Sequence, residues 1–283
     1  MRWAERLRLQ DESRFLLRSD ARHRSGEKSV TMTHPVLAAD QLTKAYASTY
    51  ALNGVSLTVH SGESAAIMGP SGSGKTTLMH LLSGILTPDA GEVRFRTGAG
   101  ILTVSGMSSE KRAQLRRQRI GFVFQEGLLL PELTAQENVA MPLMLNGAGR
   151  HQAQQRADEW LGSLGLTGME QRRPGELSGG QQQRVAIARM LMQKPRVVLA
   201  DEPVAALDPR AGRAVMDLLW EVTEEQGLTM ICTLHQLALA RDYGSRLVAL
   251  RDGRIDMDTQ MSGVADEELE GLYTAEDEVM YAH

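Results

Sequence analysis

The chain has only one cysteine and no long apolar run, and each of these features excludes some classes of protein. One thiol, Cys232, excludes an internal disulfide and fits a reducing compartment. Because it lies in the apolar run 229–232, we expect it to be buried and unreactive. No uncharged apolar stretch approaches the ~20 residues of a membrane-spanning helix, and the N-terminus lacks the apolar core of a secretory signal. We therefore expect a soluble chain that serves a membrane only by docking onto another subunit.

The sequence also lacks a strong excess of either charge. Its 31 basic and 35 acidic residues give a net charge of -4, so composition gives no reason to expect nucleic-acid binding. The basic segment 111–119 is interpreted as the solvated face of a helix rather than a polyanion site. A length of 283 residues is enough for one large domain or a core with a subdomain.

Composition divides the chain into three parts. Residues 1–34 carry many charges of both signs and are interpreted as a flexible N-terminal extension or the product of a misplaced start codon. A short amphipathic helix at a membrane surface is the alternative for this segment. Residues 257–283 form an acidic C-terminal tail, which we expect to be peripheral or partly disordered. The domain itself is predicted to span 35–256.

Within 35–256 the pattern is that of an α/β protein. Apolar strands are expected at 52–59, 64–68, 197–200, 229–233 and 246–250, with further strands between 91 and 105. Helices at 210–226 and 236–243 alternate with the later strands, which predicts a parallel sheet covered by helices on both faces. Residues 126–175 are rich in helix formers, with breaks at glycines and prolines such as Pro142, and are predicted to be an inserted helical subdomain.

A glycine-rich loop between a predicted strand and a predicted helix carries the first chemical signal. It fits the phosphate-loop pattern GxxxxGK[ST] in full. Backbone N–H groups of such a loop surround a phosphate, Lys75 would contact the β- and γ-phosphates, and Thr76 would ligate Mg²⁺. A chance glycine-rich turn is the alternative. The nucleotide-binding residues assigned here are Gly69, Pro70, Ser71, Gly72, Ser73, Gly74, Lys75, Thr76 and Thr77.

Two acids end the apolar strand at 197–200. Strand ends of a parallel sheet face the ligand edge, so Asp201 is predicted to hold Mg²⁺ and Glu202 to act as the general base for an attacking water. The alternative is an Asp-Glu pair that faces solvent. The phosphate loop upstream favours the catalytic interpretation over this one.

A second glycine-containing motif, Leu177-Ser178-Gly179-Gly180-Gln181, precedes a predicted helix at 181–192. Alone it would be a turn opening a helix. Together with the phosphate loop it makes the chain resemble the ATP-hydrolysing subunits of ABC transporters. The resemblance implies a P-loop NTPase (RecA-like) α/β core with an antiparallel β-subdomain and an inserted α-helical subdomain, and it implies ATP and Mg²⁺ as ligands.

The same resemblance implies a dimer. In the family, the segment matching Ser178, Gly179, Gly180 and Gln181 closes over the ATP held by the partner subunit, so two ATP molecules are enclosed head to tail. Asp208 resembles the residue that couples the two sites.

The resemblance to the family implies roles for three further residues, because they occupy matching positions in its motifs. Gln125 resembles the glutamine that senses Mg²⁺ and water, and His235 resembles the histidine that contacts the γ-phosphate and orients the catalytic glutamate. Tyr46 matches the aromatic residue that stacks on adenine, with Tyr50 as a substitute and a core-facing tyrosine as the alternative.

Two positions depart from the family pattern. Val204 stands where Thr is usual after Asp-Glu-Pro, and Gln236 follows His235 where Asp is usual. Neither change removes a catalytic group, so hydrolysis is expected to survive.

Different segments of the chain resemble the ATPases of different transport classes. Residues 126–145 resemble the lipoprotein-releasing and macrolide-exporter ATPases, whereas 201–208, 234–236 and 267–273 resemble phosphonate-importer ATPases. We favour the exporter-like class because the earlier segment contacts the permease in this family. A regulatory ATPase that drives a membrane complex without transport would have the same cassette. In each case the expected partners are a second ATPase subunit and a permease, at the cytoplasmic face of the cell membrane.

Overall fold

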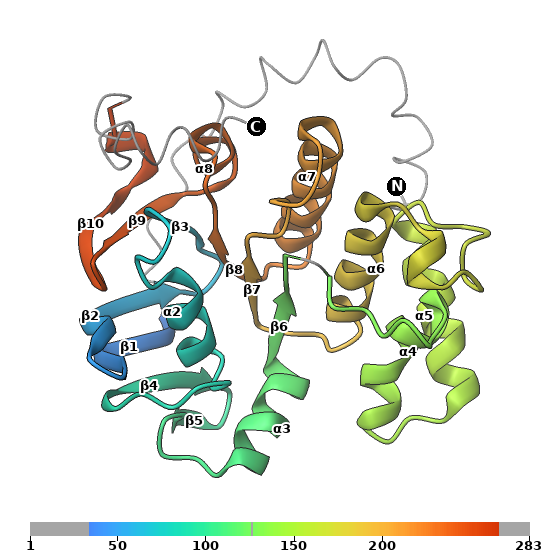
Figure 1. Ribbon diagram of the computed structural model, residues 1–283. Coiled ribbons are helices and arrows are strands. Elements are labelled where there is room, and N and C mark those ends of the chain that lie inside the picture. Colours follow the sequence, from blue (N-terminus) through green and yellow to red (C-terminus); the bar gives the residue numbers. More distant parts are fainter. Residues whose placement is uncertain (1–33, 126, 266–283) are drawn as a thin grey trace.

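A computed structural model describes residues 34–125 and 127–265 (Figure 1). The N-terminal extension up to residue 33 and most of the acidic tail, 266–283, lie outside the described residues. The described part contains two sheets, one of four strands and one of six. No helix in this part is long and apolar enough to cross a membrane.

The six-stranded sheet has the order β10-β9-β3-β8-β7-β6, and all neighbouring strands are parallel except β10, which runs antiparallel to β9. Its strands are β3 (Ser64–Met68), β6 (Ile120–Val123), β7 (Val197–Asp201), β8 (Thr229–Thr233), β9 (Arg246–Arg251) and β10 (Arg254–Gln260). The predicted parallel sheet is therefore confirmed, and Cys232 is buried in it.

The central strands are apolar because both of their faces are covered. In β7, Val197 and Leu199 belong to the core formed with the antiparallel sheet, while Val198 and Ala200 belong to the core formed with the helices on the other face. Burial on both sides explains why this strand reads as a continuous apolar run rather than an alternating one.

The four-stranded sheet is antiparallel throughout, with the order β2-β1-β4-β5, as the predicted β-subdomain requires. Its strands are β1 (Pro35–Tyr46), β2 (Thr49–His60), β4 (Ala90–Thr97) and β5 (Gly100–Thr103). Helix α2 (Lys75–Leu82) lies between this sheet and the six-stranded one (Figure 1).

Arg246 on β9 ties the two sheets together. Its guanidinium donates to the Thr58 carbonyl of β2 at 2.7 Å and pairs with Glu63 at 3.0 Å and with Asp258 of β10 at 2.5 Å. Hydrogen bonds to these two carboxylates raise the pKa of Arg246, so the charge on this connection is permanent.

The remaining helices are α3 (Ser109–Arg119), α4 (Ala135–Leu145), α5 (Arg150–Ser163), α6 (Gly179–Leu191), α7 (Pro209–Glu225) and α8 (Leu237–Tyr243), with short 3-10 turns at Pro174–Glu176 and Met261–Gly263. Of these, α3 packs on the same side of the six-stranded sheet as α2, and the others cover its opposite face or form the insertion. In Figure 1, α4, α5 and α6 form a lobe beside β6, on the side away from α2.

Two boundaries differ from the sequence expectation. Helix α4 runs through Pro142 and ends three residues later. A capping box of Thr134 and Glu137 fixes its start, and Pro142 removes only the backbone bond that its missing N–H would make to the Asn138 carbonyl. Helical bonding resumes beyond it, where the Asn146 N–H donates to the Pro142 carbonyl at 3.2 Å. Strand β10 crosses the predicted domain limit after residue 256, since its pairing with β9 continues to Gln260.

Candidate active site

Strand register brings the predicted catalytic residues to one edge of the sheet. Val123 of β6 pairs with Ala200 of β7, Ala200 pairs with Cys232 of β8, and Cys232 pairs with Ala66 of β3. Residues shortly beyond these four positions all emerge at the carboxyl edge, where parallel sheets bind ligands. The phosphate loop and the candidates Gln125, Glu202 and His235 therefore start from neighbouring strand ends.

The phosphate loop joins β3 to α2 in a conformation that only glycine permits at two points. Gly69 has a φ of 143°, and a Cβ there would lie 2.1 Å from the Leu250 carbonyl oxygen. Gly74 has a φ of 104°, and its Cβ would lie 2.3 Å from the Ala51 oxygen. Gly74 caps α2 without a side-chain hydrogen bond, so an anion could satisfy the N–H groups of the first turn.

Lys75 is buried across its own loop. Its ammonium donates to the carbonyl oxygens of Gly69 at 2.8 Å and Pro70 at 2.9 Å. This position places a positive charge inside the cradle, as binding of a phosphate chain requires.

The oxygen atoms expected to hold Mg²⁺ lie near one another. Thr76 Oγ1 is 3.5 Å from Oδ1 of Asp201, which is buried at the end of β7. The described residues contain no group of three His, Cys, Asp or Glu side chains that could hold a metal, so an ion here would take its other oxygens from phosphates and water, as Mg²⁺ commonly does.

A buried hydroxyl in the loop further fits a phosphate ligand. Among the described residues, Ser73 Oγ has no hydrogen-bond partner although it is buried. Together with the glycine cradle and the Thr76–Asp201 pair, it gives a donor set of the kind that binds Mg²⁺ and a polyphosphate.

Glu202 and His235 form a hydrogen-bonded pair through Oε1 and Nε2. Glu202 adopts a φ of 48°, a left-handed conformation that is uncommon outside glycine. The hydrogen bond from His235 lowers the pKa of the Glu202 carboxyl; burial opposes this shift, and attraction from His235 and Lys75 adds to it. The carboxylate is therefore ionised at neutral pH, which is the state that a general base needs.

Sequence reasoning missed Gln183, which connects three segments of the site. Its buried Nε2 lies 2.9 Å from the carbonyl oxygens of Phe124 and Gln125 and 2.5 Å from that of Pro203. The helix after the second glycine motif is thus attached both to the backbone at Gln125 and to the turn after Glu202. A signal was available, because Gln183 shares the buried helical stripe of Ile187 and Met190.

The second glycine motif lies elsewhere. Ser178 caps α6, accepting from the Gln181 N–H, and Gln181 Oε1 in turn accepts from the Ser178 N–H. A Cβ on Gly179 would lie 2.9 Å from Leu207, the neighbour of Asp208, which caps α7. The motif and Asp208 therefore adjoin one another, and Figure 1 shows the start of α6 on the far side of β7 from α2.

The two candidate adenine-stacking tyrosines are both on the surface. Tyr46 is 50% exposed and Tyr50 is 58% exposed, so neither faces the core. The Lys44 ammonium lies 6.0 Å from the centroid of the Tyr46 ring.

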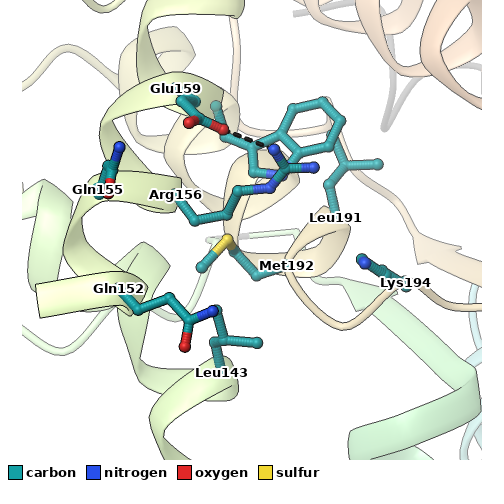
Figure 2. Close-up of a pocket in the computed structure, with 9 residues that line it drawn as sticks. Leu143, Gln152, Gln155, Arg156, Glu159, Leu191, Met192 and Lys194 are labelled. Atoms are coloured by element: carbon teal, nitrogen blue, oxygen red, sulfur yellow. Dashed lines mark hydrogen bonds and ion pairs between the residues drawn. The ribbon is translucent and has the colours of Figure 1, made fainter. Parts of the chain in front are cut away.

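A cavity of about 280 Å³ lies in the helical lobe, between α4, α5 and the end of α6. Figure 2 shows Arg156 paired with Glu159 at its wall, and the guanidinium lies 5.9 Å from the Trp160 ring centroid. None of the predicted nucleotide-binding or catalytic residues lines this cavity, so it is separate from the site at the sheet edge.

Comparison with known proteins agrees with this geometry. Residues 52–205, more than half of the chain, match the family described as ABC transporter. The chain belongs to this family. It is an ABC transporter ATPase subunit with the P-loop NTPase fold.

Solved structures support the assignment. The dimeric ATP-binding cassette MJ0796, in a post-hydrolysis state bound to ADP and Pi, is 37% identical with a TM-score of 0.73, and the match covers 81% of this chain and all of that one. CbiO1 from Clostridium perfringens, part of the ABC transporter complex cbiONQ, is 30% identical with a TM-score of 0.72, covering 83% of this chain and 92% of that one.

The Glu202–His235 pair generates a prediction about protonation. Replacing His235 with Ala removes the main cause of the lowered pKa, so the pKa of Glu202 should rise toward its ordinary value. A lowered carboxyl pKa stabilises the fold above the unfolded-state pKa and loses that effect as pH falls through the folded-state value, so the variant should be less stable at neutral pH. The carboxyl ¹³C shift of Glu202 against pH measures this. An unchanged titration would refute the pairing.

Proposed function

We propose that this ABC ATPase subunit binds and hydrolyses ATP as a head-to-tail dimer and so powers a separate membrane permease. The observation that carries the proposal is the arrangement at the sheet edge, where an ionised glutamate held by His235 lies beside a phosphate loop and a Thr76–Asp201 pair. Positioning and charge compensation are what phosphoryl transfer chiefly requires.

In this proposal the residues act as follows. The loop amides and Lys75 hold the phosphates, and Thr76, Asp201 and Gln125 hold Mg²⁺, which neutralises charge on the phosphate oxygens. Glu202 accepts a proton from the attacking water, and His235 keeps the carboxylate ionised and oriented. Tyr46 offers an exposed ring to the adenine, and Tyr50 is the alternative.

The dimer follows from the separation of the two glycine motifs. Within one subunit, the start of α6 lies away from the phosphate loop (Figure 1), yet its glycine motif is of the kind that binds an anion. A partner rotated by a two-fold axis would place Ser178, Gly179, Gly180 and Gln181 over the other subunit's nucleotide. MJ0796 has been solved as a dimer, and Asp208, next to the motif, is proposed to couple the two sites.

The permease is proposed to dock on the segment that follows Gln125. Large apolar side chains are exposed there and at the end of α4: Leu128 and Leu130 at 55% and 43%, and Met144 and Leu145 at 41% and 63%. Gln183 joins the backbone at Phe124 and Gln125, where this segment begins, to the turn after Glu202. Movement at the site would therefore reach the docking face. We propose accordingly that the subunit works at the cytoplasmic face of the cell membrane.

We further propose an exporter-like, force-transmitting system of the lipoprotein-releasing or macrolide-exporter type, because residues 126–145, which would contact the permease, resemble those ATPases. The alternatives are an ATPase of a phosphonate-type importer, supported by the pattern at 201–208, and a regulatory ATPase.

Glu202→Gln tests the chemistry. It keeps the side chain's size but removes the base, so turnover should fall about a hundredfold or more, while ATP binding persists and the closed dimer accumulates. ATPase rates and size-exclusion chromatography with ATP measure both effects. Glu224→Gln, on the exposed face of α7, is the matched control and should behave as the natural protein does. Retained hydrolysis in Glu202→Gln would remove this residue as the base.

Mixing two inactive variants tests the head-to-tail arrangement. Lys75→Ala inactivates the phosphate loop and Ser178→Arg inactivates the second motif. Because each proposed site combines a phosphate loop from one subunit with a second motif from the other, neither homodimer has an intact site. A mixed dimer regains one, and random assortment should restore about a quarter of the natural rate. A mixture as inactive as its components would argue against sites shared between subunits.

Partner capture tests the transport class. The Glu202→Gln protein with ATP should retain its permease from detergent-solubilised native membranes, for identification by mass spectrometry. We expect a permease with few spans and a large extracytoplasmic domain. A many-span permease with a solute-binding protein would instead establish the importer alternative.

A further inference from the structure

Thr233 is a polar residue at the end of an otherwise apolar central strand. It closes β8, is fully buried, and pairs in register with Asp201 of β7 on one side and Ile67 of β3 on the other. Thr233 therefore lies next to Asp201, the carboxylate expected to hold Mg²⁺, and next to Ile67, which lies two residues before the phosphate loop begins.

The hydroxyl of Thr233 makes two hydrogen bonds whose directions are fixed by chemistry. Thr233 Oγ1 lies 2.8 Å from the Glu202 amide nitrogen and 2.8 Å from Asp201 Oδ1. An amide N–H can only donate and an ionised carboxylate can only accept. The hydroxyl therefore accepts from Glu202 and donates its one hydrogen to Asp201.

Each bond constrains a group that the reaction uses. The bond to the Glu202 N–H holds a peptide in which φ is 48°, a conformation that needs support in a residue with a side chain. The bond to Asp201 fixes the same oxygen, Oδ1, that lies 3.5 Å from Thr76 Oγ1. One hydroxyl thus fixes the orientation of two groups: the carboxylate expected to hold Mg²⁺ and the peptide that carries the base.

We propose that Thr233 is a positioning residue that keeps the Mg²⁺-holding Asp201 and the base Glu202 in a fixed relation. The inference rests on the proposed function. The hydroxyl of Thr233 is bonded to the Glu202 amide and to the Asp201 carboxylate, so it acts through two neighbours at once. Removing only its hydroxyl should therefore disturb the Mg²⁺ requirement and turnover together.

Thr233→Val removes the hydroxyl and keeps the shape, and Thr233→Ser keeps the hydroxyl. The matched control is Thr229→Val at the other end of β8. Thr229 is equally buried, and its hydroxyl accepts from the Gly62 N–H at 3.0 Å and lies 3.5 Å from the His60 carbonyl. This control also removes a buried hydroxyl from β8, but at the edge away from the nucleotide.

We expect Thr233→Val to lower kcat about 10–100-fold and to raise the half-saturating Mg²⁺ concentration, as loss of a group behind a metal ligand commonly does. Thr233→Ser should restore both. ATP binding in EDTA should stay unchanged, and Thr229→Val should lose stability without either effect. A Thr233→Val protein that matches Thr229→Val in kcat and Mg²⁺ requirement, or a Ser variant that restores neither, would overturn the proposal.

Two readouts separate this inference from the proposed function. The gain in ATP affinity on adding Mg²⁺ should shrink in Thr233→Val, and hydrogen exchange of the Glu202 amide should quicken, on the order of fivefold for one lost hydrogen bond. If the natural protein binds ATP but does not hydrolyse it, the proposed function fails and these readouts still decide the role of Thr233. If neither the exchange rate of the Glu202 amide nor the Mg²⁺-dependent gain in ATP affinity changes, the positioning role of Thr233 is refuted.

Discussion

Burial of the central strands on both faces is the constraint on which the rest of the structure depends. A strand such as β7 has no solvent-facing side, so its polar chemistry can leave the sheet only at the ends. The register of β3, β8, β7 and β6 then brings four such ends to one edge. The phosphate loop, the Asp201–Glu202 pair, His235 and Gln125 are neighbours for this reason, although they are far apart in the chain.

In the proposed dimer, the two helix N-termini that carry glycine motifs serve different nucleotides. The first, at Gly74, follows β3 directly and has no side-chain cap. The second, at Ser178, is already capped by its own serine and packs beside Leu207 in the helical lobe. The first therefore suits a ligand held within the subunit, and the second is the one that we propose meets a ligand brought by a partner.

Most of the fold was predictable because its signals are local. Apolar runs bounded by turns gave the strands, and the two glycine motifs gave the family; the α/β fold with its two sheets is confirmed. Helix α4 passing through Pro142 and strand β10 passing residue 256 were not predictable, because both depend on contacts with other elements. At the site, residues in the motifs could be named in advance. The burial of Gln183 was signalled by the helical stripe it shares with Ile187. Its partners and those of Thr233 were not, because they are main-chain atoms or carboxylates on other segments.

The contacts of Gln183 have a consequence for how freely the sequence can change. Its amide group meets only backbone carbonyl oxygens, those of Phe124, Gln125 and Pro203. Every amino acid presents such an oxygen, so the side chains at these three positions can be exchanged without breaking the connection, provided that the chain keeps its path. Gln183 itself has no such latitude, because a shorter or apolar side chain could not reach three acceptors. For this linkage, tolerance to substitution is thus found at the carbonyl end and intolerance at Gln183; the side chain of Gln125 is constrained separately by its proposed role at Mg²⁺.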